Sequence, residues 1–267
     1  MRGARPTDLG TLRALLASDD GKGRLVAGGT DLVVHLHRHP EEEPHLIDIS
    51  SLEELRQIEK VGDALSVGAA VTFSEIGDSP LIRERAGALA MAAAVMGSTQ
   101  IRNRATLGGN VANASAAADG TSALCALDAL AVVEDSRGNE ERVPVRTLIT
   151  APGKTLIGPG RFLRSFLIPP QGGPSAFFKT GSRRTVTISK LNIALGRRLV
   201  LGALAPAPLD VPEAKTLLRG RSEEAFLDGL TAAVERAIPT RSSLAYKRSA
   251  VRGLGDDLWR FLLEAGR

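Results

Sequence analysis

Leu25-Val26-Ala27-Gly28-Gly29-Thr30-Asp31-Leu32 is the stretch that decides the fold, and Thr106-Leu107-Gly108-Gly109-Asn110 repeats its chemistry about eighty residues later. Each stretch places a Gly-Gly pair between an apolar run and a small polar residue, so the backbone can approach a ligand with no Cβ in the way. Bare amides of successive residues can then converge on an anion. A single Gly-Gly pair is more often a plain turn. Two such pairs together indicate a diphosphate held from both sides.

The second stretch lies within a longer run, residues 97–119, which resembles the FAD-binding (medium) subunit of the molybdenum hydroxylases. This is the flavoprotein family of xanthine dehydrogenase and carbon monoxide dehydrogenase. The resemblance continues through residues 25–32, 160–169, 178–184 and 201–209, so it covers nearly the whole chain.

The resemblance implies an α+β fold in two domains. A two-lobed PCMH-type FAD-binding domain would occupy residues 1–169, with lobes at about 1–57 and 58–169. A smaller α+β C-terminal domain, with an antiparallel sheet plus helices as in the carbon monoxide dehydrogenase flavoprotein, would occupy residues 170–267. The Pro- and Gly-rich segment 169–174 is the natural boundary between them.

The resemblance also implies an extended FAD between the two lobes, with its pyrophosphate on amides of both glycine stretches. Lys179 would add a positive charge near the flavin, although a solvated lysine is the alternative. Met96 stands where some relatives place an aromatic residue that packs on the flavin. Ile101 lies in a loop that approaches the flavin in the family, or simply anchors that loop. Carried over position by position, the cofactor contacts fall on Leu25, Val26, Ala27, Gly28, Gly29, Thr30, Asp31, Leu32, Met96, Ile101, Thr106, Leu107, Gly108, Gly109, Asn110, Asp119, Leu163 and Lys179.

Hydrophobic periodicity and turn residues predict the elements around these stretches. Thr72 and Glu75 are spaced as a capping box, and Pro80 should open one helix that continues to about Met96. The connection at residues 196–198 is shorter than in the resembled family, so either the C-terminal sheet is trimmed or residues are missing there. Helices are expected at 7–17, 119–127, 212–218, 222–237 and 242–266, and strands at 24–27, 45–49, 58–61, 65–68, 130–133, 142–145, 162–168, 176–179 and 199–203.

Composition excludes several classes of protein. Of 267 residues, 43% are apolar and 24% are charged, which is typical of a soluble globular chain. Aromatic residues make up only 3%, which argues against a stacking platform for single-stranded nucleic acid. The N-terminus lacks an apolar signal segment and no run is long enough to span a membrane, so a cytoplasmic protein is expected.

Cys125 is the single cysteine, so the chain can form no internal disulfide, no cysteine-ligated metal site and no iron–sulfur cluster of its own. We interpret it as a small buried hydrophobe. His35, His37 and His39 alternate and on a strand would share one side, but a solvated polar segment is the stronger interpretation, and no metal site is predicted.

Familiar nucleotide and catalytic motifs are absent. Gly153-Lys154-Thr155 resembles the end of a P-loop, but Leu148 stands where the first glycine is required, and no G-x-G-x-x-G follows a strand. No nucleophile, acid or base stands out, so no catalytic residue is predicted.

The resemblance therefore implies an oxidoreductase subunit that transfers electrons through FAD. A small partner subunit with two two-iron two-sulfur clusters and a large molybdopterin subunit would supply the electrons. NAD, oxygen or another acceptor would receive them. The alternative is a non-redox binding or assembly module that retains the fold. The intact pair of glycine stretches argues against that alternative.

Overall fold

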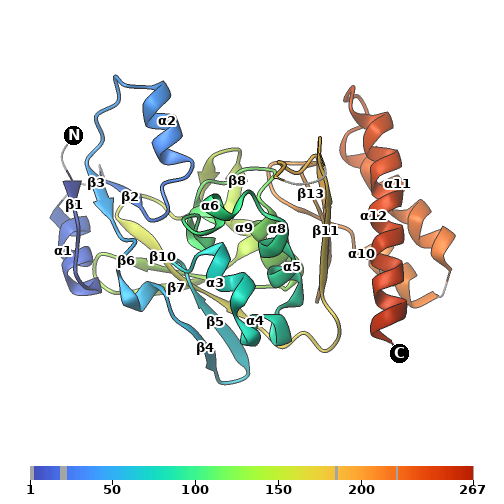
Figure 1. Ribbon diagram of the computed structural model, residues 1–267, viewed down its shortest axis with the longest axis horizontal. Helices are drawn as coiled ribbons and strands as arrows, with labels where there is room; N and C mark the ends of the chain where they lie inside the picture. Colours follow the sequence, from blue (N-terminus) through green and yellow to red (C-terminus); the bar gives the residue numbers. More distant parts are fainter. Residues whose placement is uncertain (1–2, 19–22, 184–185, 221, 267) are drawn as a thin grey trace.

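The computed structural model describes residues 3–18, 23–183, 186–220 and 222–266. Within these ranges, the strands form a three-stranded parallel sheet, a five-stranded antiparallel sheet, a four-stranded antiparallel sheet and a two-stranded one. The chain follows the long axis of the molecule, from an N-terminal lobe at one end to a pair of long helices at the other (Figure 1). This arrangement of mixed sheets and helices confirms the predicted α+β class. No helix in the described ranges has the length and apolar character that crossing a bilayer requires.

The N-terminal lobe is a small sheet covered by one helix. Its strand order is β1 (Gly3–Ala4), β3 (Leu46–Asp48), β2 (Arg24–Val26). Helix α1 (Leu9–Ser18) follows Asp8, whose carboxylate accepts a 2.7 Å hydrogen bond from the Thr11 amide. This bond is the main cause that lowers the pKa of the Asp8 carboxyl. The lobe is completed by α2 (Leu32–Arg38) and a 3-10 turn, η1 (Glu53–Leu55). Its core also takes in Ala70 and Phe162 from later in the chain.

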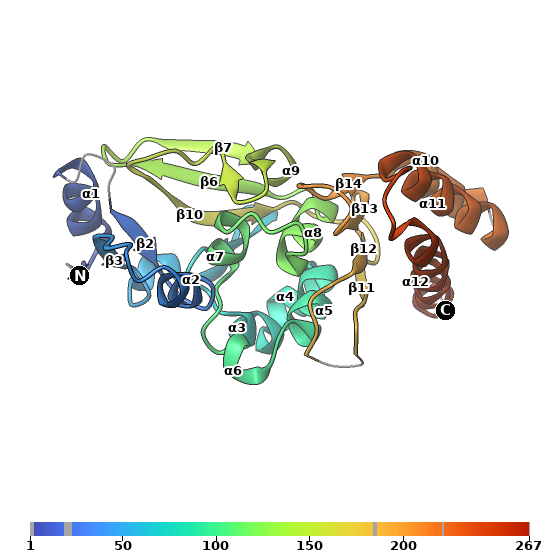
Figure 2. The same cartoon turned by 90° about the horizontal axis from the view of Figure 1, so that it is seen from above.

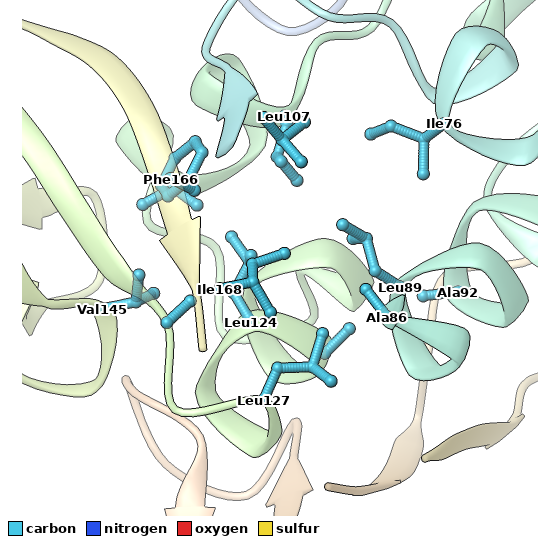
Figure 3. Close-up of a cluster of buried hydrophobic side chains, with 14 of the residues drawn as sticks. Ile76, Ala86, Leu89, Ala92, Leu107, Leu124, Leu127, Val145, Phe166 and Ile168 are labelled. Atoms are coloured by element: carbon cyan, nitrogen blue, oxygen red, sulfur yellow. The ribbon is translucent and has the colours of Figure 1, made fainter. Parts of the chain in front are cut away.

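The central lobe has five antiparallel strands with helices on one face. The strand order is β4 (Ile58–Val61), β5 (Ala64–Gly68), β10 (Arg161–Ile168), β6 (Leu130–Asp135), β7 (Glu140–Pro144). The strands predicted at 58–61 and 65–68 pair as a hairpin, and so do those predicted at 130–133 and 142–145. The main hydrophobic core lies between this sheet and the helices, where Phe166 and Ile168 of β10 lie close to Leu107, Leu124 and Leu127 (Figure 3). A small annex contains α9 (Val145–Leu148), β8 (Ile149–Ala151) and β9 (Lys154–Thr155).

The helical layer begins with α3 (Phe73–Asp78), and the predicted capping box between Thr72 and Glu75 is confirmed. The single helix predicted from Pro80 to about Met96 is wrong. The structure has α4 (Pro80–Arg85) and α5 (Gly87–Val95), separated by Ala86 at φ −144°, ψ 51°. A Cβ on Gly87 would lie 2.9 Å from the carbonyl oxygen of Ser175. The break therefore sets α5 against the C-terminal sheet at a distance that only glycine allows.

Three more helices follow: α6 (Thr99–Arg102), α7 (Leu107–Ala112), which contains the second glycine stretch, and α8 (Asp119–Ala126). Helix α8 is wholly buried, because the central sheet lies on one side of it and the C-terminal sheet on the other (Figure 2).

The C-terminal sheet has the order β11 (Ala176–Thr180), β12 (Leu191–Leu195), β13 (Leu199–Gly202), β14 (Leu209–Asp210). Leu195 pairs with Leu199, so the short connection at residues 196–198 is a tight hairpin between β12 and β13. The other face of the sheet is covered by α10 (Pro212–Leu217), η2 (Leu218–Gly220), α11 (Glu223–Ala237) and α12 (Leu244–Ala265), which confirms the predicted C-terminal helices (Figure 1).

Candidate cofactor site

The two glycine stretches lie against each other although eighty residues separate them. A Cβ on Gly28 would lie 2.0 Å from the carbonyl oxygen of Arg104 and 3.0 Å from Cα of Ala105. No side chain fits in that space. Gly28 is therefore the point at which the N-terminal lobe contacts the segment leading into α7.

A cavity of about 700 Å³ opens between the two stretches. Its volume lies within the range of about 300–1,000 Å³ that small-molecule and cofactor sites occupy. Thirteen of the residues predicted from sequence line it: Leu25, Val26, Ala27, Gly28, Gly29, Thr30, Asp31, Leu32, Met96, Ile101, Thr106, Gly109 and Asn110.

The first stretch presents unpaired main-chain amides to this cavity. From Gly28 to Leu32, the backbone N–H groups donate no hydrogen bond to any residue in the described ranges. Gly29 has φ +71°, a left-handed conformation that glycine adopts without strain, and the chain turns there into α2. Adjacent amides held in such a turn form a concave site for an anion.

The second stretch is not a loop of bare amides, and that expectation is wrong. It is the first turn of α7. The amides of Leu107 and Gly108 donate to the carbonyl oxygens of Val71 and Ala69, and the amides of Gly109 and Asn110 donate to the side chain and backbone oxygens of Thr106. Sequence reasoning missed this because a Thr followed by Gly-Gly fits a helix N-cap as well as a phosphate loop.

The side-chain amide of Asn110 is the group of α7 that is available to a ligand. Its Oδ1 accepts from the Thr121 amide at 3.1 Å, so the side chain is held with its amide nitrogen unbonded by any described residue. Because Asn110 also lines the cavity, Nδ2 is available as a donor to an acceptor oxygen there.

The far end of the cavity is basic, a feature that sequence reasoning missed. Arg24, His35, Arg38 and His39 line it. His35 and His37 lie on helix α2 rather than on a strand, and His39 is the residue that ends the helix. The rings of His35 and His39 therefore lie on one face with centroids 4.6 Å apart, while His37 bonds to the Val33 carbonyl of its own helix. Reading residues 32–38 as a helix would have placed 35, 38 and 39 together by their spacing.

Glu42 accepts hydrogen bonds from His35 and from Arg24, each 3.0 Å long. The bond from His35 is the main cause that lowers the pKa of the Glu42 carboxyl. Within the described ranges, no three His, Cys, Asp or Glu side chains gather as they would around a metal ion.

Five predicted contact positions lie away from this cavity. Leu107, Gly108 and Leu163 are buried in the core. Lys179 and Asp119 form an ion pair, 2.7 Å between Nζ and Oδ2, beside a second cavity of about 780 Å³ that Lys179 lines. Arg102 and Arg183 line it as well, and Arg184, the last residue of the resembling segment 178–184, lies outside the described residues.

Cys125 is buried in α8, and desolvation raises the pKa of its thiol to about 12. A thiol in this state is neither a nucleophile nor a metal ligand at neutral pH.

Comparison with known proteins agrees with the geometry. The family described as "FAD binding domain in molybdopterin dehydrogenase" matches residues 1–171. The xanthine dehydrogenase FAD-binding subunit of Escherichia coli is 32% identical over 243 residues, covering 85% of this chain and 83% of the relative. The nicotinate dehydrogenase FAD-subunit of Eubacterium barkeri is 30% identical over 261 residues, covering 90% and 88%.

Solved structures show the same architecture. The chain superposes on carbon monoxide dehydrogenase from Hydrogenophaga pseudoflava with a TM-score of 0.84 at 25% identity, covering 99% of this chain and 96% of the other. Quinoline 2-oxidoreductase from Pseudomonas putida gives a TM-score of 0.85 at the same identity and coverage. Its sequence, its α+β fold and these relatives agree that this chain belongs to the family of FAD-binding subunits of the molybdenum hydroxylases, which are oxidoreductases.

Proposed function

We propose that this chain carries electrons through one bound FAD, between iron–sulfur clusters held by a partner subunit and an acceptor such as NAD or oxygen. A large partner subunit with molybdopterin would oxidise the substrate, and a small one with two two-iron two-sulfur clusters would relay the electrons. Two features of the chain support a dependence on partners. Its one cysteine is buried, and a single cysteine cannot ligate an iron–sulfur cluster within this chain.

The observation that carries the proposal is the row of residues from Gly28 to Leu32, which line the first cavity and whose amides donate to no residue in the described ranges. Gly28, Gly29, Thr30 and Leu32 are half-buried and Asp31 is exposed, so these amides are accessible and can donate to a ligand rich in acceptor oxygens. The diphosphate of FAD is such a ligand. The eighteen contact positions predicted from the sequence are proposed as its environment, with the phosphates at the first stretch.

When bound, FAD supplies the redox chemistry. The chain's own residues bind and orient it. Gly28 and Gly29 let the backbone approach the phosphates, Asn110 Nδ2 donates to an acceptor oxygen, and the cations of Arg24 and Arg38 offset phosphate charge. Lys179 would stand near the flavin, where a positive charge favours the reduced form. The two-domain division at residues 169–170 and a cytoplasmic location remain predictions of the same kind.

An absorbance titration of the purified chain with FAD tests the proposal. Binding is expected with 1:1 stoichiometry and a perturbed flavin spectrum, and reduction of the bound flavin by an iron–sulfur partner should follow. Gly109→Val should abolish binding, because Gly109 is exposed to the cavity and its Cβ would already lie 3.0 Å from Thr106 Oγ1.

Gly253→Val on α12 is the matched control, since a Cβ there meets nothing within 4 Å. A chain that leaves the flavin spectrum unchanged would favour the non-redox assembly role. Equal FAD binding by both valine variants would remove α7 from the proposed site.

A further inference from the structure

The carboxylate of Asp119 is held at both of its oxygens. Oδ2 accepts from Lys179 Nζ at 2.7 Å, while Oδ1 accepts from Ser189 Oγ at 2.5 Å and from Asn192 Nδ2 at 3.2 Å. All four side chains are buried, with at most 8% of any of them exposed. Asp119 belongs to the first turn of α8, whereas the other three residues belong to the C-terminal sheet and the segment before β12. A carboxylate bonded in this way has one available orientation.

Asn192 is turned toward Asp119 at a cost. Its side chain is fully buried, and its Oδ1 has no hydrogen-bond partner in the described ranges. A 180° flip of the amide would place Oδ1 against the Asp119 carboxylate. The present orientation therefore keeps the hydrogen bond from Nδ2 to Asp119 and leaves Oδ1 without a donor.

Gly202 on the neighbouring strand leaves room for this amide. A Cβ at Gly202 would lie 2.2 Å from Asn192 Oδ1 and 2.4 Å from Ser122 Oγ. A side chain at position 202 would therefore displace the Asn192 amide.

The position of the Lys179 ammonium depends on this arrangement. Nζ donates to Asp119 and, at 3.1 Å, to the carbonyl oxygen of Thr187, and it lines the second cavity. Ser189 lies two residues after Thr187, so the same short segment bonds both members of the ion pair. A change at Ser189 would therefore reach Lys179 through Asp119.

We propose that Ser189 and Asn192 are positioning residues for the Asp119–Lys179 ion pair, and that through this pair they set the reduction potential of the bound flavin. The inference rests on the proposed function, in which Asp119 and Lys179 stand near the cofactor. The hydroxyl and the amide point the positive ends of their dipoles at Asp119. Removing one of them leaves more negative charge uncompensated, which disfavours the reduced flavin relative to the oxidised one.

Spectroelectrochemical titration of the FAD-loaded full chain tests this. Ser189→Ala should still bind FAD but should raise the ratio of the reduced-flavin Kd to the oxidised-flavin Kd about tenfold, which is a fall of about 30 mV for a two-electron couple. Ser189→Thr, which keeps the hydroxyl, should restore the potential. Ser175→Ala is the matched control, because Ser175 is also a buried serine but bonds only to the Ala88 amide.

A fourth variant, Asp119→Asn, separates failure of the inference from failure of the proposed function. It removes the carboxylate charge and should raise the potential. A shift with Asp119→Asn but equal potentials for Ser189→Ala and Ser175→Ala would overturn the positioning role and leave the proposed function intact. Unchanged potentials in all variants would overturn both the positioning role and the placement of Asp119 near the flavin. A loss of thermal stability alone in Ser189→Ala would also count against the inference.

Discussion

Gly28 shows how one missing carbon atom determines the distance between two parts of the site. We predict that Gly28→Ala weakens FAD binding by about tenfold and lowers the free energy of unfolding by about 1–3 kcal/mol, the usual cost of overpacking. The added carbon would lie 2.0 Å from the Arg104 carbonyl oxygen, and backbone cannot rotate away as a side chain can. Calorimetry and FAD titration measure the two effects.

Gly77→Ala is the control for that change, because Gly77 lies in α3 and an added Cβ meets nothing within 4 Å. It should leave FAD binding unchanged and stabilise the helix slightly. If both alanine variants bound FAD as the unaltered chain does, the contact at Gly28 would have no part in forming the cavity.

Asn110→Asp changes the charge of the site, and we expect it to leave the fold unchanged. In Asn110→Asp the retained oxygen still accepts from the Thr121 amide, while a carboxylate oxygen replaces the free Nδ2. We expect FAD affinity to fall about tenfold or more, because a donor facing phosphate becomes an anion, with little change in melting temperature.

Asn103→Asp provides the comparison, since Asn103 Oδ1 accepts from Ser74 in the same way but does not line the cavity. It adds the same charge a few residues away. Equal losses of affinity in the two variants would mean that net charge, and not the Asn110 donor, governs binding.

Helix α1 is joined to the central sheet by a buried carboxylate. Glu134 of β6 is fully buried and accepts from Arg13 of α1 at 2.6 Å and from Arg164 of β10 at 2.7 Å. Glu134→Gln should lower the free energy of unfolding by about 1.5–3 kcal/mol, the range for hydrogen bonds to charged groups. Denaturant unfolding measures it.

Glu140→Gln is the paired variant. Glu140 also reaches Arg164, at 3.1 Å, but it is 41% exposed, so its loss should cost at most about 1 kcal/mol. A Glu134→Gln variant no less stable than Glu140→Gln would show that α1 is held by apolar packing alone.

The elements were predictable from sequence wherever local signals agreed with tertiary packing. The hairpins β4–β5 and β6–β7 and the capping box at Thr72 followed from turn residues and spacing. The break at Ala86 did not, because an alanine-rich segment favours one helix locally and the contact of Gly87 with Ser175 is invisible in the sequence. Helix α2 was missed for a similar reason: Val33-Val34 and alternating histidines favour a strand.

The candidate site likewise has features that the sequence indicates and features that depend on tertiary contacts. The thirteen predicted positions that line the first cavity were carried over from the family resemblance, and the first glycine stretch is also visible from its local glycine chemistry. The occupied amides of α7 depend on carbonyl oxygens of Ala69 and Val71, and the basic end depends on helical spacing, so neither could be predicted. The contact positions themselves and the domain bounds stay predictions.

Across the whole molecule, Cys125 is a reporter of global unfolding. Burial raises its thiol pKa from 9.0 to about 12, so we expect no reaction with a disulfide reagent in the native protein at pH 8 and reaction of one thiol as denaturant unfolds the chain. Rapid labelling of native protein would show that α8 opens locally.

The raised pKa of the Cys125 thiol predicts that the stability of the protein depends on pH in the alkaline range. Above about pH 9 the unfolded thiol loses its proton while the folded one keeps it, so this group lowers the free energy of unfolding as the pH rises toward 12. Cys125→Ala should flatten that part of the profile, measured by denaturant midpoints. An unchanged slope would assign the alkaline loss of stability to other groups.

The bonds of Asp119 to Lys179, Ser189 and Asn192 cross the Pro-rich junction at residues 169–174. A polypeptide truncated at that junction would keep nearly all of residues 1–171, which match the FAD-binding domain model, but Asp119 at the start of α8 would lose all three of these donors. The C-terminal third therefore cannot be exchanged freely between relatives. A chimaera that takes this part from another relative should keep the Asp119 carboxylate neutralised only if the donors at positions 179, 189 and 192 are retained.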